Sequence, residues 1–201
     1  MSTGQERIGA KPVGSAGIIA GTVMNWIHRR RYRSIIDDLA NRTDAGAERI
    51  LDIGCGGGVA LKALSESFGR ATIIGMDHSP EMVRLSLKTN KRGVLAGRIR
   101  VLLASVENTG IEAGSIDLAT AFDTINFWTD HGAALAEIRR VLKPDGRLCI
   151  VNGYPAPGTA WYEFVKFKNE AEYRQVLEDH GFKLSGVSIE GGTIVILGES
   201  N

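Results

Sequence analysis

The stretch from Arg49 to Ala60 constrains the fold of this chain more than any other. It reads Arg-Ile-Leu-Asp-Ile-Gly-Cys-Gly-Gly-Gly-Val-Ala, so a short apolar run is broken by glycines. Such a run is typical of a strand buried on both faces. Apolar residues recur at helical spacing from Val59, which predicts that the glycine turn opens a helix whose first backbone amides are unpaired. Glycines at that point let a nucleotide-like ligand approach the backbone.

An acidic residue downstream adds a second signal. Residues 71–77 read Ala-Thr-Ile-Ile-Gly-Met-Asp, which predicts another buried strand that ends in Asp77. An acid about 20 residues beyond a glycine loop is placed to accept both hydroxyls of a ribose. The third glycine of the dinucleotide fingerprint is missing, because Val59 stands there. Asp52, just before the turn, would repel a pyrophosphate and suit an ammonium group, which favours a nucleoside that carries an amino acid.

Residues 50–58 resemble the first motif of the class I S-adenosylmethionine-dependent methyltransferases. The resemblance continues in family order and spacing through residues 75–83, 115–122 and 140–146, and it covers roughly residues 25–200. It implies an α/β fold, a doubly wound seven-stranded, mostly parallel sheet with a C-terminal antiparallel hairpin (a Rossmann-like methyltransferase fold). It also implies S-adenosylmethionine as cofactor and S-adenosylhomocysteine as product.

The resemblance assigns roles to individual residues. Asp77 would hold the ribose, and His78 and Met82 the face of the adenine. Ser105 stands where many family members have an acid that accepts from the adenine amino group, and a hydroxyl can accept the same hydrogen bond. The full set expected to bind the cofactor is Asp52, Gly54, Cys55, Gly56, Asp77, His78, Met82, Ser105, Val106 and Phe122.

Periodicity along the chain predicts the remaining elements. The expected strands are 99–104, 116–122 and 147–152, the expected helices 79–90, 133–142 and 170–180, and the expected hairpin strands 182–189 and 193–197. Residues 161–167 mix aromatics with Lys and Glu and fit neither pattern. We expect a flexible arm over residues 1–13 and a single domain over residues 14–201. Within it, residues 22–45 are expected to form N-terminal lid helices, which in this family commonly cover the cofactor.

The reaction does not require a dedicated base, because a sulfonium is already an activated leaving group and the protein mainly has to align the acceptor. If a proton must be removed, the candidates are His28, Asp123 and Tyr154. For His28 a solvated position on a helix face is an equal reading, and for Tyr154 a position in a surface loop is an equal reading. The segment that follows Asp123 contains Phe127 and Trp128, which either wall the substrate pocket or pack against the next helix.

Composition narrows the range of partners. The net charge is +1, from 24 basic and 23 acidic residues, so the chain has no global field for nucleic acid or an anionic membrane. The basic run Arg29–Arg33 lacks interleaved aromatics, and it reads as a solvated helix face or an anion site. No metal-ligand cluster is present in the sequence, and the apolar start, 13–27, is too short for a membrane span. Cys55 and Cys149 suit reduced thiols in a cytoplasmic protein.

The hypothesis that follows is methyl transfer to a small-molecule acceptor, with no membrane or nucleic-acid partner; the sequence leaves a homodimer open. Three alternatives remain, namely a nicotinamide-dependent oxidoreductase, a catalytically silent cofactor-binding scaffold and an RNA-modifying methyltransferase. The segment after residue 122 lacks the Asn/Asp-Pro-Pro-Tyr signature of enzymes that methylate amino groups of bases. This argues against DNA adenine or cytosine N4 methylation.

Overall fold

The computed structural model describes residues 14–42 and 46–200, with side chains from residue 28 onward. The arm expected over residues 1–13 lies outside these ranges. Backbone contacts divide the chain into two compact units, Met1–Ser105 and Val106–Asn201, and each is described by itself. The expectation of a single domain over residues 14–201 stays a prediction.

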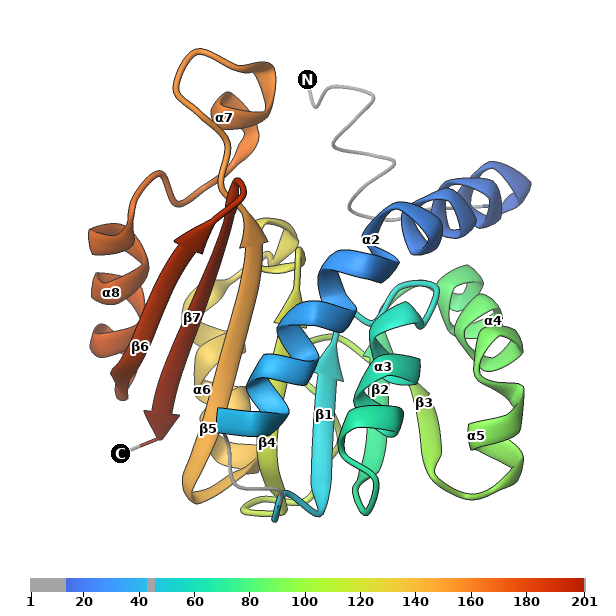
Figure 1. Ribbon diagram of the computed structural model, residues 1–201. Helices are drawn as coiled ribbons and strands as arrows, with labels where there is room; N and C mark the ends of the chain where they lie inside the picture. Colours follow the sequence, from blue (N-terminus) through green and yellow to red (C-terminus); the bar gives the residue numbers. More distant parts are fainter. Residues whose placement is uncertain (1–13, 43–45, 201) are drawn as a thin grey trace. The chain divides into compact units, whose positions relative to one another are not determined.

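The first unit is a parallel sheet with helices. Strand β1 pairs with β2, and β2 pairs with β3, each in parallel, while α2 packs on α3 and α4 (Figure 1). Helix α2 is one continuous helix that begins before the predicted residue 22. The elements are α2 (Gly14–Arg42), β1 (Arg49–Ile53), α3 (Val59–Ser67), β2 (Thr72–Asp77), α4 (Pro80–Thr89), α5 (Lys91–Leu95) and β3 (Ile99–Leu103).

The second unit contains the other four strands. Strand β4 pairs with β5 in parallel, and β7 runs antiparallel to both β5 and β6. Its elements are β4 (Ile116–Phe122), the 3-10 helix η1 (Ile125–Phe127), α6 (His131–Val141), β5 (Leu142–Gly153), α7 (Ala160–Phe164), α8 (Glu170–Asp179), β6 (Phe182–Glu190) and β7 (Thr193–Ser200). The strand order β3-β2-β1-β4-β5-β7-β6 confirms the predicted seven-stranded fold with its C-terminal antiparallel hairpin.

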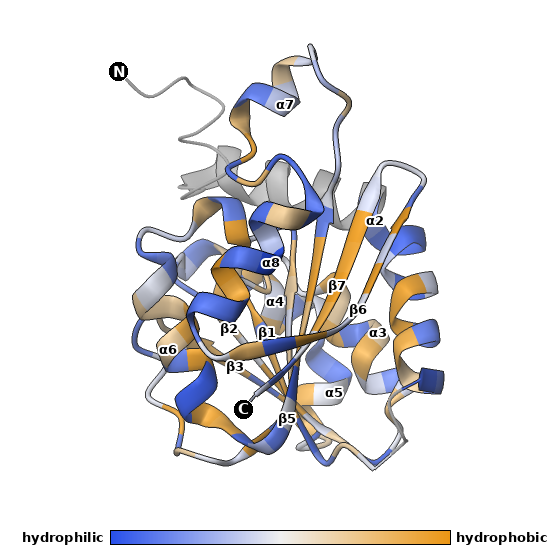
Figure 2. Cartoon of the chain, turned by 90° about the vertical axis from the view of Figure 1, so that its left-hand side faces the viewer, coloured by the Kyte–Doolittle hydropathy of each residue, from blue (hydrophilic) through white to orange (hydrophobic). Residues whose placement is uncertain are grey.

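Apolar burial follows the patterns on which the elements were predicted. The strands are mostly hydrophobic, whereas the helices carry hydrophobic residues on one side (Figure 2). In α8, Tyr173 and Leu177 are buried at the i, i+4 spacing of a helix face. Ile194 and Ile196 of β7 are fully buried at the alternation of a strand. Cys55 and Cys149 are both free and buried.

Strand β5 departs from its predicted start at residue 147. Ile116 pairs with Leu142 and Leu118 pairs with Arg147, so residues 143–146 of β5 lie opposite the single residue Asp117 of β4. Asp145 has a φ of 62° in this irregular stretch. Residues 143–146 do end helix α6 as expected, but pairing with β4 begins before them.

A polar network joins α6 to the loop that precedes β4. Glu137 accepts hydrogen bonds from Arg140, at 2.6 and 2.8 Å, and from the backbone N–H and hydroxyl of Thr109, at 2.9 and 2.6 Å. These donors lower the pKa of Glu137 to about 2, with the arginine as the largest cause. The ionised carboxylate is therefore part of the folded structure of this unit.

Candidate functional site

The glycine turn joins β1 to α3 in a left-handed backbone conformation. The φ angle is 50° at Gly56 and 82° at Gly58, values that favour glycine. A methyl group on Gly58 would lie 2.4 Å from both Asn90 Nδ2 and Ser86 Oγ, so this glycine lets the turn pack closely on α4. A methyl group on Gly56 would meet no heavy atom of the described residues within 4 Å. Gly56 therefore leaves open space beside the backbone, as a ligand cradle requires.

Asp77 at the end of β2 is tied to this turn. One carboxylate oxygen accepts from the backbone N–H of Gly56 at 3.0 Å, and the other accepts from that of Ser79 at 2.8 Å. The residue is only 7% exposed. Burial raises the pKa of Asp77 above its usual value of 3.8, although the two backbone N–H groups act in the opposite direction. A carboxylate has about four acceptor positions, so each oxygen keeps capacity for a further donor.

Asp52 and Cys55 lie before and within the turn. Asp52 is buried in β1. The backbone N–H of Cys55 donates to Met76 O at 2.8 Å, and the Cys55 carbonyl accepts from Gly58 N at 2.9 Å. Burial, and after it the nearby carboxylates, raise the pKa of the Cys55 thiol well above its usual value. Cys55 thus has both backbone groups engaged inside the site and keeps a neutral thiol.

The residues expected around the adenine differ in exposure. The side chain of His78 is 47% exposed, with Nδ1 3.9 Å from Asp77 Oδ1. Met82, in contrast, is buried in the first turn of α4, where its N–H donates to the capping hydroxyl of Ser79. Between these two residues, His78 offers the larger surface to a ligand.

The end of β3 is held beside Asp77. The N–H of Ala104 donates to the carbonyl of Asp77 at 3.1 Å, and the half-buried Ser105 follows directly. Ser105, whose hydroxyl is predicted to bind the edge of the adenine, therefore follows a residue that is hydrogen-bonded to Asp77, the predicted ribose ligand. Val106 and Phe122 belong to the second unit, where both are buried.

His28 lies on α2 and is half-buried. Its ring stacks on that of Tyr32 with centroids 5.2 Å apart, and Arg31 Nη1 lies 3.5 Å from its Nδ1. The basic run shares this helix, and Arg33 pairs with Asp37 at 2.9 Å and with Glu66. These acids, Asp37 first, raise the pKa of Arg33. Arg31 and Arg33 of the run therefore already have contacts within their own unit.

Asp123 follows β4 in the second unit and has a φ of 56°, which is uncommon for a residue other than glycine. Its N–H donates to Val151 O at 2.7 Å, and its Oδ1 accepts from Gly153 N at 2.8 Å. Asp123 therefore ties the exit of β4 to the end of β5. This positioning contact was not foreseen from the sequence, and the strained backbone is consistent with a functional site.

Tyr154 is half-buried directly after β5, and its N–H donates to Gly192 O at 2.7 Å. Asn152, two residues before Tyr154, is fully buried and donates from Nδ2 to the hydroxyl of Tyr173 at 2.7 Å. Burial raises the pKa of Tyr173 to about 12. The phenol is therefore neutral at physiological pH and serves the packing of α8.

The sequence did not assign a role to Phe127, Trp128 or the segment 161–167. In the structure, Phe127 and Trp128 make different contacts. Trp128 is buried and its ring lies 6.1 Å from that of His131, so it packs on the following helix. Phe127 instead contacts Phe164, at 5.3 Å between ring centroids. Helix α7, which holds Phe164, was missed. Thr159, whose hydroxyl accepts from Tyr162 N at 3.2 Å, is the helix-capping signal that could have revealed it.

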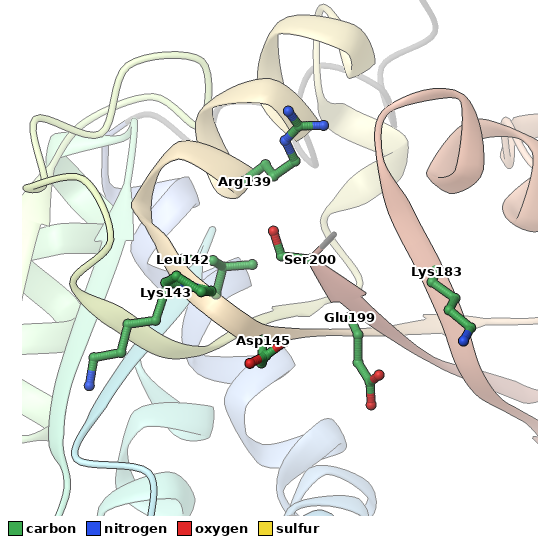
Figure 3. Close-up of a pocket in the computed structure, with 8 residues that line it drawn as sticks. Arg139, Leu142, Lys143, Asp145, Lys183, Glu199 and Ser200 are labelled. Atoms are coloured by element: carbon green, nitrogen blue, oxygen red, sulfur yellow. The ribbon is translucent and has the colours of Figure 1, made fainter.

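A surface hollow lies at the opposite end of β5 from Gly153 (Figure 3). Charges of both signs line it, and some are already paired, since Lys143 Nζ lies 2.6 Å from Asp117 Oδ1. Its lining residues are Arg139, Leu142, Lys143, Pro144, Asp145, Lys183, Glu199 and Ser200. It includes none of the predicted site residues.

Over the described ranges, no helix combines the length and the apolar character that crossing a bilayer requires. No group of three or more His, Cys, Asp or Glu side chains in the same ranges is placed to hold a metal ion.

Comparison with known proteins places this geometry in a family. A family described as methyltransferase domain matches residues 51–150, about half of the chain. The chain is 37% identical over 107 residues to the ubiquinone/menaquinone biosynthesis C-methyltransferase UbiE of Citrifermentans bemidjiense, covering 53% of this chain and 46% of that protein. It is 34% identical over 110 residues to the nocamycin O-methyltransferase of Saccharothrix syringae, covering 54% of this chain and 39% of that protein. The chain thus spans less than half the length of these curated relatives.

A solved structure shares the fold across most of the chain. The crystal structure of an S-adenosylmethionine-dependent methyltransferase from Aquifex aeolicus superposes with a TM-score of 0.69 at 21% identity, over 84% of this chain and 98% of that one. The segment matched by the family includes the glycine turn, Asp77 and strands β2, β3 and β4. The chain therefore belongs to the class I S-adenosylmethionine-dependent methyltransferases.

Proposed function

We propose that this protein binds S-adenosylmethionine and transfers its methyl group to a small-molecule acceptor. Family membership supports the reaction, and the names of the relatives include both a C-methyltransferase and an O-methyltransferase. The acceptor atom is therefore not assigned from these relatives. The Asp77 site is the single observation that carries the cofactor assignment to this chain.

The residues present fit an adenosine that carries an amino acid. Asp77 is fixed by Gly56 and Ser79, and its oxygens keep acceptor capacity for two ribose hydroxyls. The space beside Gly56 admits a ligand to the backbone. Asp52 is buried one residue before the end of β1. Its carboxylate suits the ammonium group of the methionine part.

When bound, S-adenosylmethionine supplies a methyl group on a positively charged sulfur, so transfer breaks the carbon–sulfur bond, leaves its electron pair on sulfur and joins the methyl carbon to a lone pair of the acceptor. The protein contributes alignment and exclusion of water. An acceptor hydroxyl or amine also loses a proton. His28, Asp123 and Tyr154 stay the candidates to take it, and solvent can take it where the acceptor is acidic enough.

The alternatives fare differently. Membership of the methyltransferase family disfavours a nicotinamide-dependent oxidoreductase. An RNA substrate would use the run Arg29–Arg33, but Arg33 is paired with two acids and Arg31 lies over the ring of Tyr32 at 5.4 Å. A silent scaffold would keep the cofactor site and lack an acceptor.

Calorimetric titration tests the proposal with the full chain. We expect S-adenosylhomocysteine to bind and NADH to give no heat; tight NADH binding without S-adenosylhomocysteine binding would refute the assignment. Transfer of labelled methyl groups from S-adenosylmethionine to a panel of small acceptors then separates an active enzyme from a silent scaffold. Binding of RNA that weakens steeply with salt and disappears when residues 29–33 become Ala would instead favour an RNA substrate.

A further inference from the structure

Three aromatic side chains of the second unit form a row of rings. Phe127, at the end of η1, lies 5.3 Å from Phe164 between ring centroids, with the ring planes tilted by 48°. Phe164 in turn stacks on Trp161, with centroids 4.8 Å apart and planes within 26°. The row links the segment that follows β4 to the segment that follows β5, two neighbouring parallel strands.

Trp161, the last ring of the row, is 47% exposed, while Phe127 and Phe164 are half-buried. Within the part of the chain that the structure describes, the large hydrophobic side chains that are exposed are Leu87, Leu95, Leu103, Trp161 and Ile189. Trp161 is the aromatic member of this set. Tryptophan offers a large flat apolar surface at a low cost in side-chain entropy, so an exposed one is a common binding element.

The position of the indole connects it to the predicted acceptor side. A methyl group on Gly153 would lie 3.2 Å from Trp161 Nε1 and 4.0 Å from Asp123 Oδ1, so both groups adjoin the end of β5. Open α/β sheets bind their ligands beyond the carboxyl ends of their strands. A flat apolar surface and a carboxylate therefore lie together at the ends of β4 and β5.

Contacts that do not involve the Trp161 side chain also hold α7 and the residues that follow it. Val165 is buried directly after the helix. Lys166 donates from its backbone N–H to Asn126 Oδ1 at 3.0 Å and from Nζ to Trp128 O at 2.7 Å. Lys168 donates to the carbonyl of Tyr162 and lies over its ring at 4.7 Å. These contacts hold the segment in place while the indole keeps its exposed surface.

From these observations we infer that Trp161, supported by Phe164 and Phe127, is the stacking wall of the acceptor site, and that the acceptor is a flat aromatic ring that carries a hydroxyl group. The ring lies against the indole, and its hydroxyl donates to Asp123. Because the carboxylate of Asp123 would repel a negatively charged acceptor, a neutral hydroxylated ring is preferred to an anionic one. This inference rests on the proposed function and adds the class of the acceptor to it.

The test measures binding of phenol, catechol and 2-naphthol to the full chain saturated with S-adenosylhomocysteine, by equilibrium dialysis or calorimetry. Decahydro-2-naphthol, which has the hydroxyl but no aromatic ring, is the matched probe. We expect wild-type protein to bind at least one aromatic probe, and to bind 2-naphthol more tightly than its saturated counterpart. Binding of neither, or equal binding of both two-ring probes, would overturn the inference.

Variants of α7 locate the binding. Trp161→Ala should weaken binding of the aromatic probe by roughly 5- to 150-fold, the range found when an aromatic side chain that stacks on a nucleobase is replaced by alanine. Trp161→Phe should restore most of it, and Trp161→Leu, which keeps an apolar side chain but no flat ring, should not. The control is Tyr162→Phe, which removes only the hydroxyl of a neighbouring aromatic of α7, keeps the ring under Lys168 and should leave binding unchanged.

The outcomes keep the two proposals apart. Every Trp161 variant should bind S-adenosylhomocysteine as wild type does and melt at a similar temperature. If the wild-type protein does not bind S-adenosylhomocysteine, the proposed function itself is refuted. Normal S-adenosylhomocysteine binding, with probe binding that is insensitive to Trp161→Ala or fully kept in Trp161→Leu, would overturn the aromatic acceptor alone.

Discussion

Replacing Asp77 by Asn tests the cofactor site with the smallest change in shape. The carboxylate now accepts one backbone N–H on each oxygen, from Gly56 at 3.0 Å and from Ser79 at 2.8 Å. An amide can accept only one of these, because its NH2 group is itself a donor. The substitution therefore leaves one backbone donor facing another and removes the charge that would strengthen bonds to the ribose.

The two effects have different sizes. A buried donor without a partner costs about 1–3 kcal/mol, but removal of a buried charge offsets part of this, so we expect stability to fall by up to about 2 kcal/mol. For a chain of this length that corresponds to roughly 4–8 °C in melting temperature. Lost charge-assisted bonds to the ribose should weaken S-adenosylhomocysteine binding by a further 1–3 kcal/mol or so, about 5- to 150-fold.

Calorimetry at neutral pH, well below the melting temperature of the variant, measures the dissociation constant. The control is Asp38→Asn, since Asp38 lies on α2 with its side chain 65% exposed and its removal changes the net charge equally. The control should bind as wild type does. A folded Asp77→Asn protein with an affinity within about twofold of wild type would show that the nucleoside lies elsewhere.

Acidification gives an independent measure of the same group. Burial raises the pKa of Asp77 above 3.8, so S-adenosylhomocysteine binding should start to weaken at a higher pH than an exposed aspartate would cause. The change of folding stability with pH is opposite to that caused by an acid in an ion pair, whose pKa is lowered in the folded state. Because the folded state holds this proton more tightly, the contribution of Asp77 to stability falls as the pH rises through the window above 3.8. Asp77→Asn should remove both dependences.

Three further substitutions separate packing from binding. Gly58→Ala should cost about 2–4 kcal/mol through its positive φ and the 2.4 Å clash with α4, whereas Gly56→Ala should cost only about 1 kcal/mol and mainly impair cofactor binding; equal melting temperatures would contradict this. Glu137→Gln should remove up to about 3 kcal/mol that is present above pH 4.5 and lost as the pH falls to about 2, which urea unfolding across this range measures. Tyr173→Phe leaves Asn152 Nδ2 without its acceptor and should cost about 1–3 kcal/mol, and an unchanged melting temperature would refute that bond.

Local rules predicted much of the fold. The buried strands, the glycine turn and the acid at the end of β2 follow from short apolar runs and their breaks. The start of α4 follows from Ser79, whose hydroxyl caps the helix, and from Pro80 at its first position. These signals depend on a few neighbouring residues and on backbone geometry, so they can be read before tertiary structure is known.

The features that were missed depend on contacts between distant residues. The fit of Gly58 against Ser86 and Asn90 joins two segments about 30 residues apart, and no local pattern encodes it. The early start of β5 depends on pairing with β4, and the bond between Asp123 and Gly153 depends on the exits of both strands. The roles of the cofactor-binding and catalytic candidates stay predictions, because they depend on where a ligand lies.

The backbone clasp on Asp77 has a thermodynamic consequence for the living protein. Two peptide groups hold the carboxylate in one rotamer before any ligand arrives, so binding need not immobilise that side chain. The free energy needed to order this side chain is spent during folding, and the folded protein also holds the carboxylate of Asp77 where water solvates it poorly. A ligand that donates hydrogen bonds to this carboxylate stabilises the folded state through mass action, by about 2.7 kcal/mol at a concentration 100 times the dissociation constant. Cellular cofactor supply would then help to set how much of this protein survives heat and proteolysis.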